Sequence, residues 1–137
     1  MSLFDVFTVA GSGMSAQTIR LNTIASNLAN ANSVSGSEKN AYKAKQPVFS
    51  SVLYGMQDDQ ATVGVKVDRI VEDQRPSVRR YDPSNPMANA EGYIYLSNVN
   101  TVEEMTNMIS ASRSYQNNVE SMNTAKQMML ATLRLGE

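Results

Sequence analysis

Residues 3–32 read LFDVFTVAGSGMSAQTIRLNTIASNLANAN and carry the strongest periodic pattern in the chain. Apolar residues recur every seven positions, and a largely apolar second row follows three positions later, which is the spacing of a helix that buries a narrow seam. The first row is Phe7, Met14, Leu21 and Leu28, and the second is Ala10, Gln17, Ile24 and Ala31. We therefore expect an N-terminal helix that ends near Asn32 and Ser33, before the turn-forming residues 34–37.

A second long helix is expected at the other end of the chain, from Val99 to Leu135. Thr101 and Glu104 fit a capping box at its start, and Gly136 is a stop signal at its end. One row of this helix is Met108, Tyr115, Met122 and Met129, and the row three positions earlier is Met105, Ser112, Val119, Lys126 and Leu133. The two helices, each about 45 Å long, predict a mainly α fold in which they pair as an antiparallel coiled coil.

The middle of the chain predicts a small β and loop insert. Val63, Val65 and Val67 alternate with polar or small residues, as in a half-buried strand. Residues 47–54, ended by Gly55, and residues 92–96 suggest two more strands, whereas the prolines at 76, 83 and 86 mark a loop. The predicted organisation is an N-terminal helix in residues 1–33, an extended segment in 34–97 and a C-terminal helix in 98–137.

The composition excludes several classes of function. The 137 residues have a formal net charge of −1 and contain neither Cys nor His, which argues against nucleic-acid binding, thiol or Ser-His-Asp catalysis and most zinc sites. No apolar run is long enough to span a membrane, and the N-terminus lacks the features of a cleaved signal peptide. We expect no enzyme activity, no cofactor, no metal and no small-molecule substrate.

Three features resemble ligand sites and have a simpler structural interpretation. Residues 11–16, GSGMSA, fit the G-x-G-x-x-A pattern of a dinucleotide-binding turn, but no apolar strand follows the expected helix, so we favour a bend or a close helix contact. Asp58 and Asp59 are adjacent acids in a turn without a third ligand, and the methionines at helical spacing favour packing. Tyr93 and Tyr95 lack basic neighbours, which favours packing over stacking on a base or sugar.

Both ends of the chain resemble the flagellar axial family of rod and hook proteins. Residues 26–32, SNLANAN, resemble the family's N-terminal signature, and residues 98–105 with 109–116 resemble the C-terminal signature of a proximal rod member. Residues 42–49, 81–86 and 126–136 agree as well. Two positions depart from the pattern: Ser97 stands where the family often has Pro, and Asn118 stands where Ala is common.

The resemblance implies a structural subunit of the proximal rod in the bacterial flagellar basal body. Family members pair their terminal helices on the inside of a hollow, helically assembled tube, with the middle segment outside. It also implies export by the flagellar type III apparatus without a cleaved signal peptide, and assembly in the periplasm for motility. The implied partners are copies of the chain itself, the rod proteins FlgB, FlgF and FlgG, the adaptor FliE and the inner-membrane MS ring.

Under this hypothesis, subunits pack through residues of both helices. These are Phe7, Met14, Leu21, Ile24, Asn27, Leu28, Asn30, Met108, Tyr115, Val119, Met122, Met129 and Leu133. Two alternatives remain at this point. The chain could be a non-polymerising helical hairpin that displays its middle segment to one partner as an adaptor, or a dinucleotide-binding enzyme.

Overall fold

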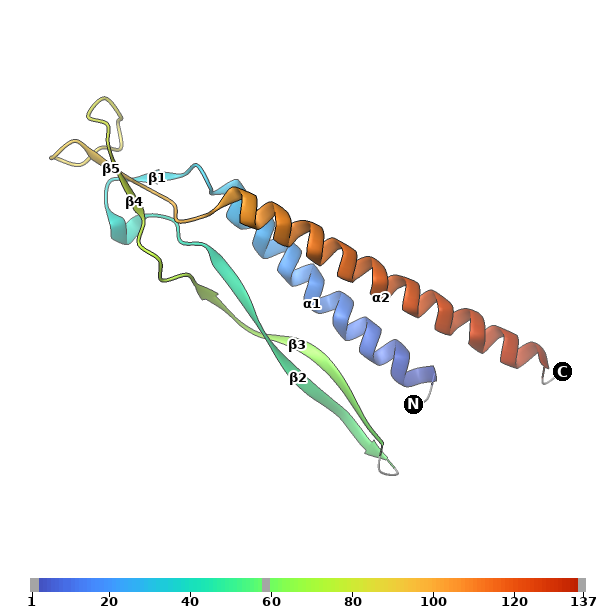
Figure 1. Ribbon diagram of the computed structural model, residues 1–137. Helices are drawn as coiled ribbons and strands as arrows, with labels where there is room; N and C mark the ends of the chain where they lie inside the picture. The colour runs from blue at the N-terminus through green and yellow to red at the C-terminus, as the bar shows by residue number, and fades with distance from the viewer. Residues whose placement is uncertain (1–2, 58–59, 136–137) are drawn as a thin grey trace.

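The computed structural model describes residues 3–57 and 60–135 (Figure 1). Two long helices lie at the ends of the chain and two antiparallel sheets lie between them in sequence. The elements are α1 (Leu3–Ala29), β1 (Val34–Ser35), the 3-10 helix η1 (Glu38–Asn40), β2 (Lys45–Gln57), β3 (Gln60–Glu72), β4 (Val78–Tyr81), β5 (Tyr93–Leu96) and α2 (Thr101–Leu135).

Helix α1 lies between α2 on one side and the β2–β3 hairpin on the other (Figure 1). The two helices run antiparallel, so that the start of α1 and the end of α2 lie at the same end of the molecule. On the hairpin side, the Ser12 hydroxyl accepts a hydrogen bond from the backbone N–H of Val65 at 3.2 Å. Ser12 thereby satisfies a strand donor that would otherwise need water.

The predicted fold class, mainly α with a coiled coil and a small insert, is wrong. The middle of the chain is a large β-rich region: β2 and β3 each have 13 residues and form a long hairpin, and β1, β5 and β4 form a three-stranded sheet. Because α1 contacts both α2 and this hairpin, it buries a broad face in place of a narrow seam. Its most buried residues are Ala10, Ala16, Thr23, Ile24 and Asn27.

The second row predicted for α2 is also misplaced. Met105 and Leu133, which belong to that row, are exposed. The buried residues of α2 are Glu104, Ala111 and Ala125. Each lies four positions before a residue of the Met108 row, whereas the predicted second row lies three positions before it. Small side chains at this contact allow the helices to approach closely, and a hydrophobicity pattern gives alanine little weight.

Several predicted boundaries shift. Helix α1 ends at Ala29, before Asn32, because the Asn30 N–H is shared between the carbonyls of Ser26 and Asn27, which tightens the last turn. Strand β2 continues through Gly55 to Gln57. The stretch predicted as a proline-marked loop contains strand β4.

The three-stranded sheet lies at one extremity of the molecule, and the start of α1 and the end of α2 lie at the other (Figure 1). Its central strand is β5, and Ile94 on that strand is fully buried. Gly92 precedes β5 with φ of 81°, a conformation that favours glycine, and a Cβ there would lie 2.9 Å from the Tyr81 ring.

The buried apolar core of the described residues is thin. It consists of six alanines and two isoleucines, Ile24 and Ile94, while many large apolar side chains are exposed. Neither described helix has a segment long and apolar enough to cross a membrane. The predictions made for Asp58, Asp59 and Gly136 fall outside the described residues.

Candidate functional site

A network of asparagine side chains connects the end of α1 to the hairpin and to α2, and Asn27 is its centre. Asn27 is fully buried. Its Nδ2 donates to the Lys45 carbonyl at 2.8 Å, and its Oδ1 accepts from the Lys45 N–H at 2.9 Å and from the Tyr42 hydroxyl at 3.1 Å. The side-chain amide therefore pairs with both backbone groups of one residue, as a neighbouring strand does, and fixes where β2 leaves α1.

Asn98 performs a similar role between the sheets and the start of α2. Its Oδ1 accepts from the Ala44 N–H at 2.7 Å, and its Nδ2 donates to the carbonyls of Asp73 at 3.2 Å and Arg75 at 2.8 Å. The neighbouring Ser97 hydroxyl donates to the Ala31 carbonyl at 2.6 Å. Ser97, one of the two departures from the family pattern, thus joins the entry of α2 to the exit of α1.

The N-cap of α2 is Asn100, one residue before the predicted cap at Thr101. The Asn100 Oδ1 accepts from the N–H groups of Val102 at 3.1 Å and Glu103 at 3.3 Å. Asparagine caps as well as threonine does, so the sequence alone did not separate the two registers. Glu104 lies on the same face of α2 as Ala111 and Ala125 and is buried.

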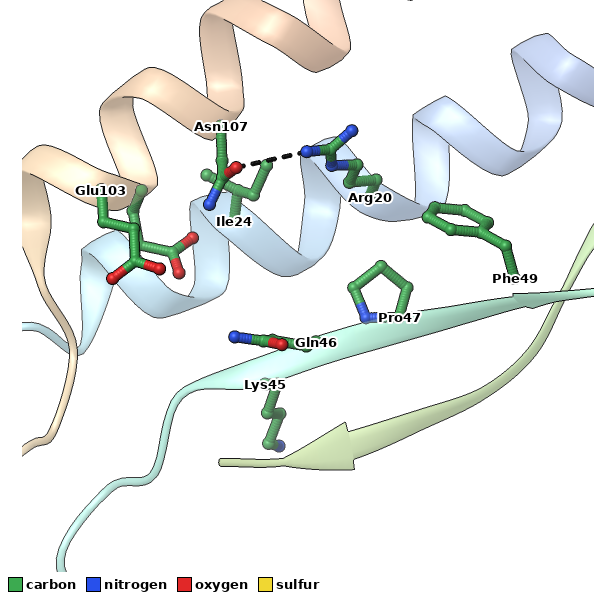
Figure 2. Close-up of a pocket in the computed structure, with 9 residues that line it drawn as sticks. Arg20, Ile24, Lys45, Gln46, Pro47, Phe49, Glu103 and Asn107 are labelled. Atoms are coloured by element: carbon green, nitrogen blue, oxygen red, sulfur yellow. Dashed lines mark hydrogen bonds between the residues drawn. The ribbon is translucent and has the colours of Figure 1, made fainter. Parts of the chain in front are cut away.

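A cavity of about 390 Å³ opens where α1, β2 and the start of α2 meet (Figure 2). The Arg20 guanidinium extends toward α2 and its Nη2 donates to the Asn107 Oδ1 at 3.2 Å. The side chain of Lys45 points away from the helices, and its ammonium lies 5.8 Å from the centre of the Tyr42 ring. The lining residues are Arg20, Ile24, Lys45, Gln46, Pro47, Phe49, Glu103, Glu104 and Asn107.

The two glutamates that line this cavity have different surroundings. Burial raises the pKa of the Glu104 carboxyl, a hydrogen bond with the Asn27 side chain lowers it, and the charge of Glu103 raises it again. Glu103 lies 3.6 Å from Arg75 Nη1, and Arg75 also forms an ion pair with Asp73 at 2.6 Å. The hydrogen bond from Arg75 lowers the pKa of Asp73.

The residues predicted from sequence for subunit packing divide into three groups. Ile24 and Asn27 are buried inside the subunit. Tyr115 and Leu133 are exposed. The half-buried members are Phe7, Met14, Leu21, Leu28, Asn30, Met108, Val119, Met122 and Met129.

Sequence reasoning missed a different surface, the outer face of α2. Val102, Met105 and Ile109 are exposed and follow one another at the spacing of one helix face, opposite to the face that contains Glu104 and Ala111. Met105 belongs to the second row predicted for α2, but neither it nor Val102 nor Ile109 was among the residues predicted for subunit packing.

The GSGMSA stretch lies within α1, and the residues before it are helical, so the dinucleotide-binding turn does not form. A Cβ at Gly13 would lie 2.7 Å from the Asn118 Nδ2, so this glycine allows a close contact with α2. Asn118 is the second departure from the family pattern. Among the described residues, no group of three or more acidic side chains that could hold a metal ion is found.

Two family patterns match the chain, one at each end. Residues 7–36 match the family described as flagella basal body rod protein. Residues 90–135 match the family described as flagellar basal body rod FlgEFG protein C-terminal. The first match includes Asn27, and the second includes Ser97, Asn98 and Glu104.

Full-length relatives are similar along the whole chain. The flagellar basal-body rod protein FlgC of Salmonella typhimurium is 51% identical over 137 residues, which is 100% of each chain. The FlgC proteins of Yersinia enterocolitica and Bacillus subtilis are 50% and 34% identical, again with 100% of each chain covered.

Proposed function

The chain belongs to the FlgC family of flagellar basal-body rod proteins, and from this membership we propose how it assembles. It is a structural subunit of the basal-body rod and is located in the flagellar basal body. We propose that it polymerises helically with other rod subunits through the outer face of α2 and the exposed parts of α1, and forms part of a hollow shaft.

The observation that supports this proposal is the contrast between the thin core and the exposed apolar side chains. Alanines make up most of the buried apolar residues of the described chain, whereas Val102, Met105 and Ile109 face solvent along one side of a long helix. Exposed contiguous apolar surface marks interaction sites in soluble proteins. A face of this kind on one helix suits a heterologous contact, in which a different surface of the neighbour covers it and the assembly stays open.

We further propose how the regions of the subunit are placed within the rod. The N-terminal region, residues 1–33, and the C-terminal region, residues 98–137, which contain α1 and α2, face the inside of the tube, and residues 34–97 lie outside. The proposed partners are copies of the chain, FlgB, FlgF, FlgG, FliE and the MS ring. The proposed route is export through the flagellar type III apparatus without removal of the N-terminus.

Replacement of Ile109 tests the outer face of α2. Ile109 is 57% exposed, so Ile109→Asp should change the stability of the free chain by no more than about 0.5 kcal/mol. In a rod contact the same carboxylate would be buried without a partner, which is costly. We expect a protein with native circular dichroism that is missing from isolated basal bodies, and cells that do not swim.

Ile109→Leu is the matched control, because it conserves volume and hydrophobicity. It should enter basal bodies and support motility. Normal swimming of the Ile109→Asp strain would show that this face of α2 is free in the rod.

A further inference from the structure

The three-stranded sheet is joined to the rest of the subunit by four short segments of chain (Figure 1). The main packing contacts lie within each sheet and between α1 and both α2 and the β2–β3 hairpin, which together form a helix–hairpin body. The four segments, called the neck below, are residues 30–33, 36–44, 73–77 and 97–100. The orientation of the sheet relative to the body therefore depends mainly on the neck.

Backbone pairing alone gives the neck little rigidity. Among the described residues, one backbone hydrogen bond joins two neck segments, from the Asp73 N–H to the Ala44 carbonyl at 2.7 Å. That bond continues the ladder of the β2–β3 hairpin and does not reach the segment that leaves β5. Chain segments without a ladder of backbone bonds open at low free energy unless side chains hold them.

Two adjacent side chains after β5 reach the other segments of the neck. The Ser97 hydroxyl donates to the Ala31 carbonyl at 2.6 Å, which joins the fourth segment to the first. The Asn98 Oδ1 accepts from the Ala44 N–H at 2.7 Å, which joins the fourth segment to the second. Ala44 is 1% exposed, so its N–H depends on Asn98 for a hydrogen-bond partner.

The Asn98 amide also holds the third segment of the neck. Its Nδ2 donates to the carbonyls of Asp73 at 3.2 Å and Arg75 at 2.8 Å. These two residues are linked to each other and to α2, because the Arg75 guanidinium pairs with Asp73 at 2.6 Å and lies 3.6 Å from Glu103. The third segment is therefore held both to the segment that leaves β5 and to the first turn of α2.

We propose that Asn98 locks a joint between the three-stranded sheet and the helix–hairpin body. Its one planar amide accepts and donates at the same time, and it joins three of the four neck segments. With the amide in place the sheet has a single orientation relative to the body, and without it the sheet turns about the neck as about a hinge. A locked subunit presents its sheet and its helices to neighbours in fixed relative positions, which lowers the entropy cost of assembly.

Asn100, two residues after Asn98, provides a matched comparison. The Asn100 Oδ1 accepts from the N–H groups of Val102 and Glu103, in the first turn of α2. The two asparagines therefore share a residue type and a neck segment, but Asn98 joins segments to one another and Asn100 caps a helix. Loss of either amide should lower stability, whereas loss of Asn98 alone should free the joint.

Distances between pairs of spin labels, measured by double electron–electron resonance on the purified full-length chain, test the lock. The chain contains no cysteine, so introduced cysteines carry the labels without background. Arg80→Cys on β4 with Glu120→Cys on α2 spans the joint, and Asn22→Cys on α1 with Glu120→Cys lies within the body. All three positions are exposed. We expect a narrow distance distribution for both pairs when Asn98 is present.

Asn98→Ala should broaden the distribution of the pair that spans the joint at least about twofold and leave the pair within the body unchanged. Asn100→Ala should lower the Tm through loss of the cap and leave both distributions narrow. If circular dichroism shows that Asn98→Ala does not fold, Asn98→Asp replaces it, because it keeps the acceptor for Ala44 and loses both donor bonds. A broad distribution across the joint in the native background, no broadening in the Asn98 variant, or equal broadening in Asn100→Ala would each overturn the lock.

Discussion

The side chain of Asn27 does at residue scale what a backbone strand usually does. It hydrogen-bonds to the N–H and the C=O of Lys45 and also accepts a hydrogen bond from the Tyr42 hydroxyl. The Asn27 side chain is fully buried. Few other residues have a donor and an acceptor on one planar group at this length. Asn27 therefore helps to fix the direction of the hairpin relative to α1, together with the hydrogen bond from Val65 to Ser12.

Asn27→Ala should destabilise the chain strongly, because it leaves the N–H and C=O of Lys45 without partners. A buried unsatisfied group costs about 1–3 kcal/mol, so we expect a loss of about 2–4 kcal/mol in the free energy of unfolding. Urea unfolding followed by circular dichroism measures it. Asn22→Ala, at an exposed position of the same helix, should change stability by no more than about 0.5 kcal/mol.

Glu104 predicts a pH dependence of stability. Its pKa is higher in the folded chain than in the unfolded chain, where it is about 4.3. The folded state therefore takes up the proton more readily, and the cost of burying the charged form is largest above the folded pKa and disappears as pH falls toward the unfolded value. Asp73, with a lowered pKa, contributes stability above its ordinary value and loses it only at lower pH.

Glu104→Gln removes this cost because glutamine stays neutral. We expect the Tm of the variant to rise relative to the native chain between about pH 5 and about pH 7.5, with the gap widest at the upper end. Thermal melts across this range, with Glu120→Gln as the reference variant, measure the gap. A constant gap would mean that Glu104 does not titrate differently on folding.

At the scale of elements, the contact between α1 and α2 depends on residues without bulk. Ala10 and Ala16 on α1 and Ala111 and Ala125 on α2 are buried, and Gly13 lies against Asn118. Such residues let two helices approach closely, while the larger apolar side chains remain available on other faces.

The two helical glycines should respond differently to substitution. Gly11→Ala should stabilise the chain by about 0.5–1 kcal/mol, because glycine disfavours a helix interior and the new Cβ would meet no atom within 4 Å beyond the nearby backbone of its own helix. Gly13→Ala should gain less, because its Cβ would lie 2.7 Å from the Asn118 Nδ2. Asn118→Ala added to Gly13→Ala should recover the gain, and thermal unfolding of the three variants decides the matter.

The sequence predicted both terminal helices and the three main strand segments, because heptad spacing is typical of a helix and alternation is typical of a strand. It did not predict β4, whose four residues are all exposed and show no alternation between buried and exposed positions. The coiled coil was a wrong prediction because the heptad row of α1 cannot show that a hairpin also packs on that helix. The residues of that row, Phe7, Met14, Leu21 and Leu28, are only half-buried.

The candidate site was predicted only in part. Residues 26–32 and 98–105 were singled out by resemblance, but neither Asn27 nor Asn98 could be assigned its partners, since Lys45, Ala44 and Asp73 lie far away in sequence. The register of α2 was wrong by one residue at its cap. The burial of Glu104 was also not predicted, because a glutamate in a capping box is expected at the surface.

The whole molecule combines a thin interior with a long apolar exterior, and this predicts a pattern of chemical protection. Met105 and Met128 are exposed in the single subunit. Brief peroxide treatment should oxidise both in the free chain and spare Met105 in intact basal bodies, where a neighbour covers the outer face of α2. Mass spectrometry of the methionine-containing peptides measures the ratio.

Met108 and Met122 are internal references for this experiment, because both are half-buried within the subunit. Their oxidation should differ less between the free and assembled states. Equal oxidation of Met105 in both states would mean that the outer face of α2 stays uncovered.

The start of α1 and the end of α2 lie together, and the three-stranded sheet lies at the opposite extremity (Figure 1). The two ends of the subunit therefore differ in structure, so its orientation in an assembly can be determined. An epitope placed at Ser84, between β4 and β5, and another near Arg134 would decorate an assembled particle at separate heights. Electron microscopy with gold-labelled antibodies would then read which way each molecule points along the drive shaft.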